Sequence, residues 1–126
     1  MKIGISSTTG NEKALVDPRF GRCEAFAIID TETSAIQFLD NAAKTAAGGA
    51  GIAAAQQLLD AGVEAVCTGN LGPNAFRVLN EAGIKAYRVN EMPLMDAAKL
   101  LKDGKLDEIS QAGRAHAGMG GRGANR

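Results

Sequence analysis

The sequence predicts a layered α/β domain built on a mixed β-sheet, and three observations support this prediction. Alternating apolar residues indicate strands, as in Lys2–Ser7, where Ile3 and Ile5 share one face. Later in the chain, apolar residues recur at helical spacing. Residues 58–66 (LLDAGVEAV) are echoed by residues 79–87 (LNEAGIKAY), which indicates two successive helix-to-strand units. Right-handed crossovers between such units connect parallel strands.

The first part of the chain is expected to consist mainly of strands. Residues 2–7 form the first strand. Residues 25–30 (AFAIID) and 35–39 (AIQFL) form two more, joined by a short polar connection as in an antiparallel hairpin. The connection 9–23 shows no periodic pattern, and an unstructured loop of this length is more often functional than not.

The second part of the chain is expected to alternate helices and strands. Glycine supplies the left-handed end of a helix, and proline suits a first helical position. The expected elements are a helix from about 48 to 62, a strand at 63–67, a helix from Pro73 to about 82, a strand near 84–87 and a helix at about 93–104. The sheet therefore has five strands, of which the first, fourth and fifth are parallel.

Charge divides the chain into a domain, residues 1–110, and a tail, residues 111–126. The domain carries all 14 acidic residues and a net charge of −3, whereas the tail has three arginines and no acid. Five glycines, four alanines and no branched aliphatic or aromatic residue cannot bury enough surface to offset the entropy of ordering. We therefore expect a disordered Gly/Arg-rich tail.

Composition also narrows the partners and the compartment. The domain lacks the excess of cations that nonspecific nucleic-acid binding requires, so nucleic acid is not an expected partner. No apolar run approaches the roughly 18 residues of a membrane span. Two cysteines 44 positions apart, without a secretory segment before them, indicate reduced thiols and a cytoplasmic location.

Candidate binding residues gather in the loops at the carboxyl ends of the parallel strands, where open α/β sheets bind ligands. The long loop supplies two arginines, and two glycine-opened helix starts supply unpaired backbone N–H groups with about half a positive charge each. The candidate cofactor-binding residues are Arg19, Phe20, Gly21, Arg22, Gly49, Gly51, Gly69, Asn70 and Gly72. This combination favours a sizeable anion.

Soft donors at the same edge suggest that the anion contains a metal. Cys23 lies at a strand start and is expected to be exposed, with Arg22 beside it favouring the thiolate. Cys67 is a second candidate ligand, although its strand spacing also fits a small core residue. His116, in the tail, is a third candidate ligand, with solvation as its alternative. The arginines could instead be solvated or paired with Asp17 or Glu24.

Motifs of common enzyme classes are missing from the sequence. Residues 49–54 (GAGIAA) superficially match a dinucleotide-binding fingerprint, but no strand leads directly into them and no acid follows about 20 residues later. There is no Walker loop, no nucleophile elbow and no zinc-type spacing of Cys or His. We therefore do not expect a conventional enzyme.

Three segments resemble the dinitrogenase iron-molybdenum cofactor biosynthesis family of the NifX and NifB carboxyl-terminal type. They are Lys2–Ser7, the stretch VDPRFGRCEAFAIID (16–30) and the stretch from GAGIAAAQQ to AGIKAY (49–87). The likeness covers about residues 1–103, and its most specific pieces are the Phe-Gly-Arg loop and the GNLGPNA segment. The resemblance implies a ribonuclease H-like three-layer fold and the binding of metal–sulfur clusters, including iron–molybdenum cofactor precursors.

These lines together predict a non-enzymatic carrier or scaffold for an anionic iron–sulfur or molybdenum–iron–sulfur cluster, which would exchange it with donor and acceptor proteins. The large cofactor-synthesising enzyme of this family carries a separate radical domain with a three-cysteine motif. This chain has only two cysteines, so we expect no counterpart of that domain. One alternative is a protein-interaction module that binds no cluster. A ribonuclease H-like nuclease is a weaker alternative, because Lys2–Ser7 lacks the acid that such enzymes carry on their first strand.

Overall fold

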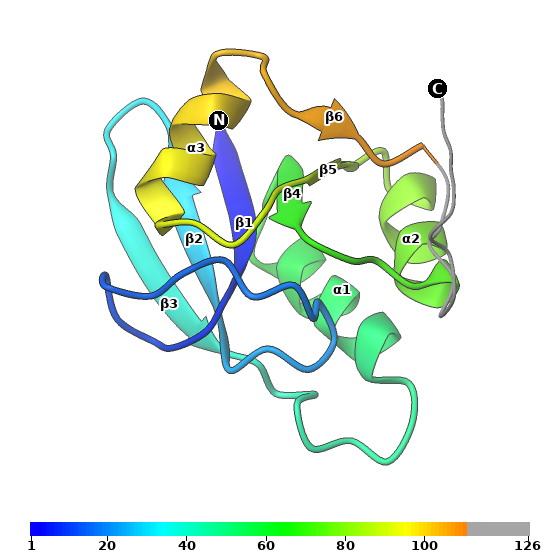
Figure 1. Ribbon diagram of the computed structural model, residues 1–126. Helices are drawn as coiled ribbons and strands as arrows, with labels where there is room; N and C mark the ends of the chain where they lie inside the picture. The colour runs from blue at the N-terminus through cyan, green and yellow to red at the C-terminus, as the bar shows by residue number, and fades with distance from the viewer. Residues whose placement is uncertain (111–126) are drawn as a thin grey trace.

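A mixed sheet of six strands runs through the molecule in the order β3-β2-β1-β4-β5-β6 (Figure 1). The computed structural model describes residues 1–110. Its strands are β1 (Lys2–Ser7), β2 (Ala25–Asp30), β3 (Ile36–Asp40), β4 (Ala65–Thr68), β5 (Lys85–Arg88) and β6 (Asp107–Glu108). Its helices are α1 (Ala50–Asp60), α2 (Pro73–Glu81) and α3 (Leu94–Lys102).

Strand directions follow the predicted topology. β1 pairs antiparallel with β2 and parallel with β4, and β4 pairs parallel with β5. The five predicted strands are all present, and β6 adds a two-residue antiparallel partner to β5. A strand of two residues is too short for an alternating pattern, which explains why the sequence did not reveal it.

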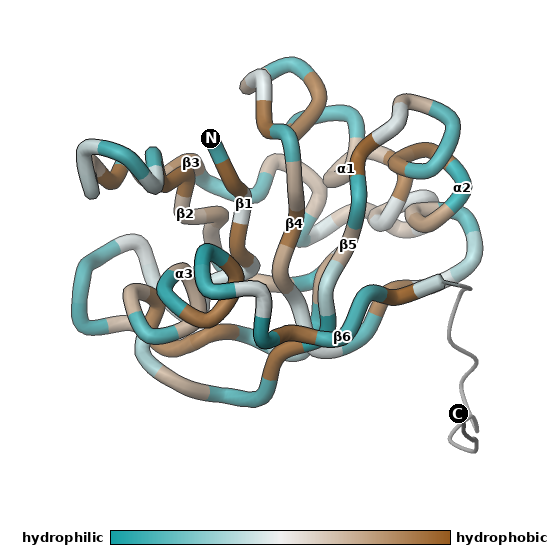
Figure 2. Tube along the Cα trace, turned by 90° about the horizontal axis from the view of Figure 1, so that it is seen from above, coloured by the Kyte–Doolittle hydropathy of each residue, from teal (hydrophilic) through white to brown (hydrophobic). Residues whose placement is uncertain are grey.

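Helices cover both faces of the sheet, which confirms the three-layer α/β fold. Figure 2 shows α1 and α2 on one side and α3 on the other. Because side chains alternate along a strand, Ile3 and Ile5 of β1 join the hydrophobic core beneath α3, whereas Gly4 faces the core beneath α1 and α2. A Cβ on Gly4 would lie 3.1 Å from Leu58 Cδ2, so the missing side chain lets α1 pack directly on β1.

The repeated sequence segment corresponds to a repeated turn. Gly62 and Gly83 follow the ends of α1 and α2 with φ of 80° and 77°. In each turn the residue after the glycine donates a hydrogen bond to a carbonyl five residues earlier, over 3.4 Å and 2.9 Å. These bonds close a Schellman-type helix end that directs the chain into the next parallel strand. Gly104, at the predicted end of the third helix, closes a third turn of this kind after α3.

The carboxyl ends of β1, β4 and β5 lie at one edge of the sheet, and the long loop after β1 crosses that edge. Residues 1–110 contain no helix of the length and hydropathy needed to cross a bilayer.

Candidate functional site

The loop that follows β1 is held directly against the turn that follows β4. Asp17 N–H donates to the carbonyl of Ser6 over 2.8 Å, and Asn70 N–H donates to the carbonyl of Pro18 over 2.9 Å. Gly69 allows this approach, because a Cβ built on it would lie 2.7 Å from Pro18 Cα. The loop after β1 and the turn after β4, which the sequence predicted to lie at the same edge, thus form one surface.

Asp17 anchors Arg19 in this surface. The Asp17 carboxylate is almost fully buried and accepts three hydrogen bonds from Arg19: from its backbone N–H at 2.9 Å, its Nε at 3.0 Å and its Nη2 at 2.8 Å. Burial acts to raise the pKa of Asp17, but the hydrogen bonds and charge of Arg19 outweigh it and hold the pKa below its ordinary value. The Arg19 side chain remains 66% exposed, so its guanidinium is oriented by the protein yet faces solvent.

Two buried hydroxyls support the loop from below. Ser6 Oγ donates to the Asp17 carbonyl over 2.6 Å and lies 2.8 Å from Thr68 Oγ1. Because the Ser6 proton is committed to the carbonyl, the Thr68 hydroxyl must donate to Ser6 Oγ. The ends of β1 and β4 therefore hold the backbone of residue 17 in place.

Gly21 brings the same loop onto the first turn of α1. A Cβ on Gly21 would lie 3.0 Å from the Gly51 nitrogen, and a Cβ on Gly51 would lie 3.3 Å from Ala75 Cβ at the start of α2. The loop and the two helix starts are therefore contiguous. Neither helix has a side-chain cap or an acidic residue in its first turn, so neither positive end is neutralised locally. Gly49 and Gly72 are the N-cap residues of α1 and α2.

Arg22 joins the loop to the segment that leads into α1. Its Nη1 donates to the carbonyls of Lys44 and Ala46, over 3.2 Å and 2.7 Å. The buried Asn41 reinforces this connection, since its Nδ2 donates to the carbonyls of Gly21 and Cys23. Arg22 is exposed, but it makes no ion pair with Glu24, which pairs instead with Lys44 at 2.7 Å.

Phe20 has a different role from the predicted one. Its ring is 3% exposed and packs against Phe26, with the ring centroids 5.3 Å apart. Its side chain therefore belongs to the core beneath α1 and α2 and does not reach a ligand at the surface. It holds the loop down so that its neighbours can face outward.

The predicted exposure of Cys23 is wrong. The residue is fully buried, and its thiol donates to the Phe20 carbonyl over 3.4 Å. Burial raises the pKa of Cys23 to about 12, which favours the protonated thiol over the thiolate that binds metals. Phe20 turns the chain inward just before the cysteine, so the neighbouring Arg22 does not activate it.

The two cysteines also do not share a site. Cys23 lies in the core beneath α1 and α2, whereas Cys67 lies in the core beneath α3, on the other face of the sheet. Cys67 is fully buried as well, and burial raises its pKa to about 12. The pair therefore does not form the predicted rim of sulfur donors. No group of three or more His, Cys, Asp or Glu side chains that could hold a metal ion occurs within residues 1–110.

The remaining candidate ligand, His116, lies outside the described residues, as does the whole predicted tail. The structure thus brings together Arg19, Gly21, Arg22, Gly51, Gly69 and Asn70, with Gly49 and Gly72 at the adjoining helix starts.

Two residues at this edge of the sheet were not predicted from the sequence as part of the site. Asp17 was considered only as a charge partner, because nothing in a linear sequence shows that its carboxylate is buried. Arg88 is the last residue of β5, and its Nη1 donates to the Gly69 carbonyl over 2.7 Å. The rule that selected the other candidates, position at the carboxyl end of a parallel strand, also applies to Arg88 and could have identified it.

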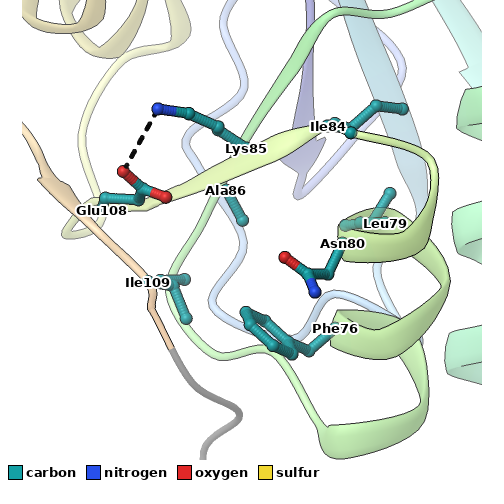
Figure 3. A pocket seen from close by; sticks show the side chains of 9 residues that line it. Phe76, Leu79, Asn80, Ile84, Lys85, Ala86, Glu108 and Ile109 are labelled. Carbon is teal, nitrogen blue, oxygen red and sulfur yellow. Dashed lines mark ion pairs between the residues drawn. The ribbon is translucent and has the colours of Figure 1, made fainter.

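A pocket of about 140 Å³ lies elsewhere, between α2, the first half of β5 and β6 (Figure 3). Phe76, Ile84 and Ile109 supply apolar walls, and Lys85 pairs with Glu108 at its rim over 3.8 Å. The candidate site lies at the opposite end of β5, where Arg88 ends the strand.

Fold and site together define a small three-layer α/β protein whose anchored arginine loop meets two helix starts at the carboxyl edge of the sheet. Comparison with known proteins identifies the family within this class. The family model described as dinitrogenase iron-molybdenum cofactor matches residues 1–104, and the chain belongs to this family.

Solved structures and one further relative are similar to this chain over most of their length. The apo form of the orange protein from Desulfovibrio gigas is similar with a TM-score of 0.85 and 36% identity, over 90% of this chain and 96% of that one. A NifB-like protein from Thermotoga is similar with a TM-score of 0.77 and 32% identity, over 90% and 97% of the two chains. An uncharacterised protein of Methanocaldococcus jannaschii is 33% identical over 97 residues, which are 75% of this chain and 82% of that protein.

Proposed function

We propose that this protein is a non-enzymatic carrier or scaffold for an anionic metal–sulfur cluster, of the iron–sulfur or iron–molybdenum cofactor precursor type. The observation that carries the proposal is the anchored loop 17–23, which joins two arginines to the positive ends of α1 and α2. Such clusters are anions with peripheral sulfides. Oriented guanidinium and backbone N–H donors match both their charge and their acceptors. Membership of the dinitrogenase iron-molybdenum cofactor family supports the same cargo.

The way the cargo is held follows from the chemistry of the edge. Both thiols are buried and protonated at neutral pH, so they are poor ligands in this conformation. Charge and hydrogen bonds at Arg19, Arg22 and the glycine-rich helix starts are the better candidates. A carrier benefits from such binding, because the cluster can leave without breaking metal–protein bonds. The donor and acceptor proteins would be other cluster-handling proteins of a cytoplasmic maturation route.

Anaerobic reconstitution of the full chain with iron, sulfide and molybdate tests the proposal. We expect a protein fraction that retains metal after gel filtration, with visible absorption and a defined stoichiometry of metal and sulfide. Arg19→Gln should lower retention, whereas Arg77→Gln, at an exposed arginine within α2, is a matched control. Absence of retained metal under every combination of these components would overturn the proposal and leave an interaction module as the better reading.

Cysteine variants then separate the two modes of binding. If charge holds the cluster, Cys23→Ser and Cys67→Ser retain equal amounts of metal, provided that thermal unfolding shows both variants to be folded. Selective loss in Cys23→Ser would contradict binding by charge alone. It would support the thiolate ligation that the sequence predicted.

A further inference from the structure

Arg88 is a cation at the candidate edge to which no role has yet been assigned. It ends β5 directly opposite Thr68 of β4, and it is exposed. Its Nη1 donates to the Gly69 carbonyl over 2.7 Å, which fixes the direction of the guanidinium. No carboxylate of residues 1–110 lies within ion-pair distance of it, in contrast to Arg19 and Lys44. Its charge is therefore not neutralised by a neighbouring carboxylate in the described part of the chain.

Arg88 lies on the face of the sheet that α1 and α2 cover. Ala86 belongs to the core beneath α1 and α2, and side chains alternate along a strand, so Arg88 lies on that same face. The carbonyl that it contacts precedes the N-cap of α2, Gly72, by three residues. Arg88 therefore contacts the turn that leads into α2.

The turn at Gly69 and Asn70 has an arginine on either side. Residues 18 and 19 run parallel to Asn70 on one flank, joined by the bond from Asn70 N–H to the Pro18 carbonyl. Arg88 occupies the other flank. Each guanidinium is tethered, Arg19 by the buried Asp17 and Arg88 by a carbonyl, and each has further N–H groups without a partner among residues 1–110.

We propose that Arg88 and Arg19 act as a pair that binds one anionic group of the cargo, a tetrahedral thiometallate or oxometallate face, across the Gly69–Asn70 turn. This inference rests on the proposed function and assigns Arg88 a binding role within it. Two tethered guanidiniums lose little conformational freedom on binding, and each can donate two parallel hydrogen bonds to neighbouring sulfide or oxide atoms. Arg88→Lys would keep the charge but could not donate these two parallel hydrogen bonds.

Titration of the full chain with tetrathiomolybdate tests the pair, with molybdate as a second probe of equal charge and shape but hard oxygen atoms. We expect Arg88→Gln to weaken tetrathiomolybdate binding about tenfold, and Arg88→Lys to weaken it less. Arg77→Gln should bind as the unaltered protein does. The difference between Arg88→Gln and the unaltered protein should shrink at high salt, because screening reduces the contribution of a surface charge.

The outcomes separate this inference from the proposed function. Unaltered protein that retains neither the reconstituted cluster nor tetrathiomolybdate overturns both. Unaltered protein that binds tetrathiomolybdate, with Arg88→Gln binding equally well, overturns only the role of Arg88. Equal weakening by Arg88→Gln and Arg88→Lys, with no dependence on salt, would show that Arg88 only tethers Gly69, and this too overturns the inference. Tighter binding of tetrathiomolybdate than of molybdate supports a sulfide-bearing cargo, and the reverse order argues against it.

Discussion

Replacement of Gly69 by alanine tests the contact on which the site depends. The added Cβ would lie 2.7 Å from Pro18 Cα and 2.8 Å from Pro18 Cβ, well inside van der Waals contact. Neither of these atoms is the end of a flexible side chain, so the loop or the turn must move as a whole. Overpacking of this kind costs about 1–3 kcal/mol. For a domain of this size that corresponds to roughly 4–12 °C in the midpoint of thermal unfolding.

Gly48→Ala is the matched control for this experiment. Gly48 precedes α1 near the same edge, has open space where a Cβ would lie and does not have a positive φ. Alanine there should leave stability unchanged or raise it by up to about 1 kcal/mol, because it restricts the unfolded chain.

Thermal unfolding followed by circular dichroism compares the two variants, and metal retention after reconstitution gives a second readout. We expect Gly69→Ala to be less stable and to retain less metal, because the Asn70–Pro18 hydrogen bond of 2.9 Å must lengthen as the segments separate. If Gly69→Ala unfolds at the same temperature as Gly48→Ala, then the loop and the turn are not packed as the structure has them. That result would show that the loop and the turn do not form a single contiguous surface.

Three further predictions concern the same region. Iodoacetamide near pH 8 should label Cys23 and Cys67 only after denaturation, since burial raises both pKa values to about 12; labelling of the native protein at the rate of an unfolded thiol would contradict this. Asp17→Asn should cost about 1–3 kcal/mol at neutral pH. The pKa of Asp17 is lower in the folded state, so the stability that its charge contributes is complete above the ordinary value of 3.8 and is lost as the pH falls below it. The unfolding midpoints of the two proteins should therefore converge in acid, and a constant difference at low pH would count against the ion pair. Phe20→Ala should cost about 3–5 kcal/mol in urea unfolding, because it empties a core position; a cost below about 1 kcal/mol would mean that the ring is not packed on Phe26.

Local patterns were sufficient to predict most of the fold. Alternation in Lys2–Ser7, the proline at the start of α2 and the repeated helix-to-strand segment are short-range signals that depend on backbone geometry. The parallel direction of β4 and β5 followed from the helix between them, because parallel strands are joined by crossover connections and antiparallel strands by short hairpins. β6 was not predicted, because its pairing with β5 depends on distant residues rather than on any pattern of its own.

The candidate site was predicted less completely, for a physical reason that its two cysteines illustrate. Their positions in the loop and strand were readable, but the face of the sheet and the depth of each sulfur were not. Cys23 follows a loop in which Phe20 turns inward, and it is buried with it, whereas Cys67 faces the opposite core. Burial then determines the protonation state of each thiol.

The sequence by itself determined the layered α/β architecture, the family resemblance and the gathering of glycines and arginines at one edge of the sheet. These depend on periodicity, turn residues and chain topology, which act over short distances or by general rules. Only the tertiary structure decided which of those groups are exposed at this edge and which are buried. The buried carboxylate of Asp17 orients Arg19, the missing side chain of Gly69 admits the loop, and Arg88 joins them from β5. The contacts of Gly69 join it to Pro18 and Arg88, which lie 51 and 19 positions away in the printed sequence. Packing between such distant segments leaves no signal in the order of residues.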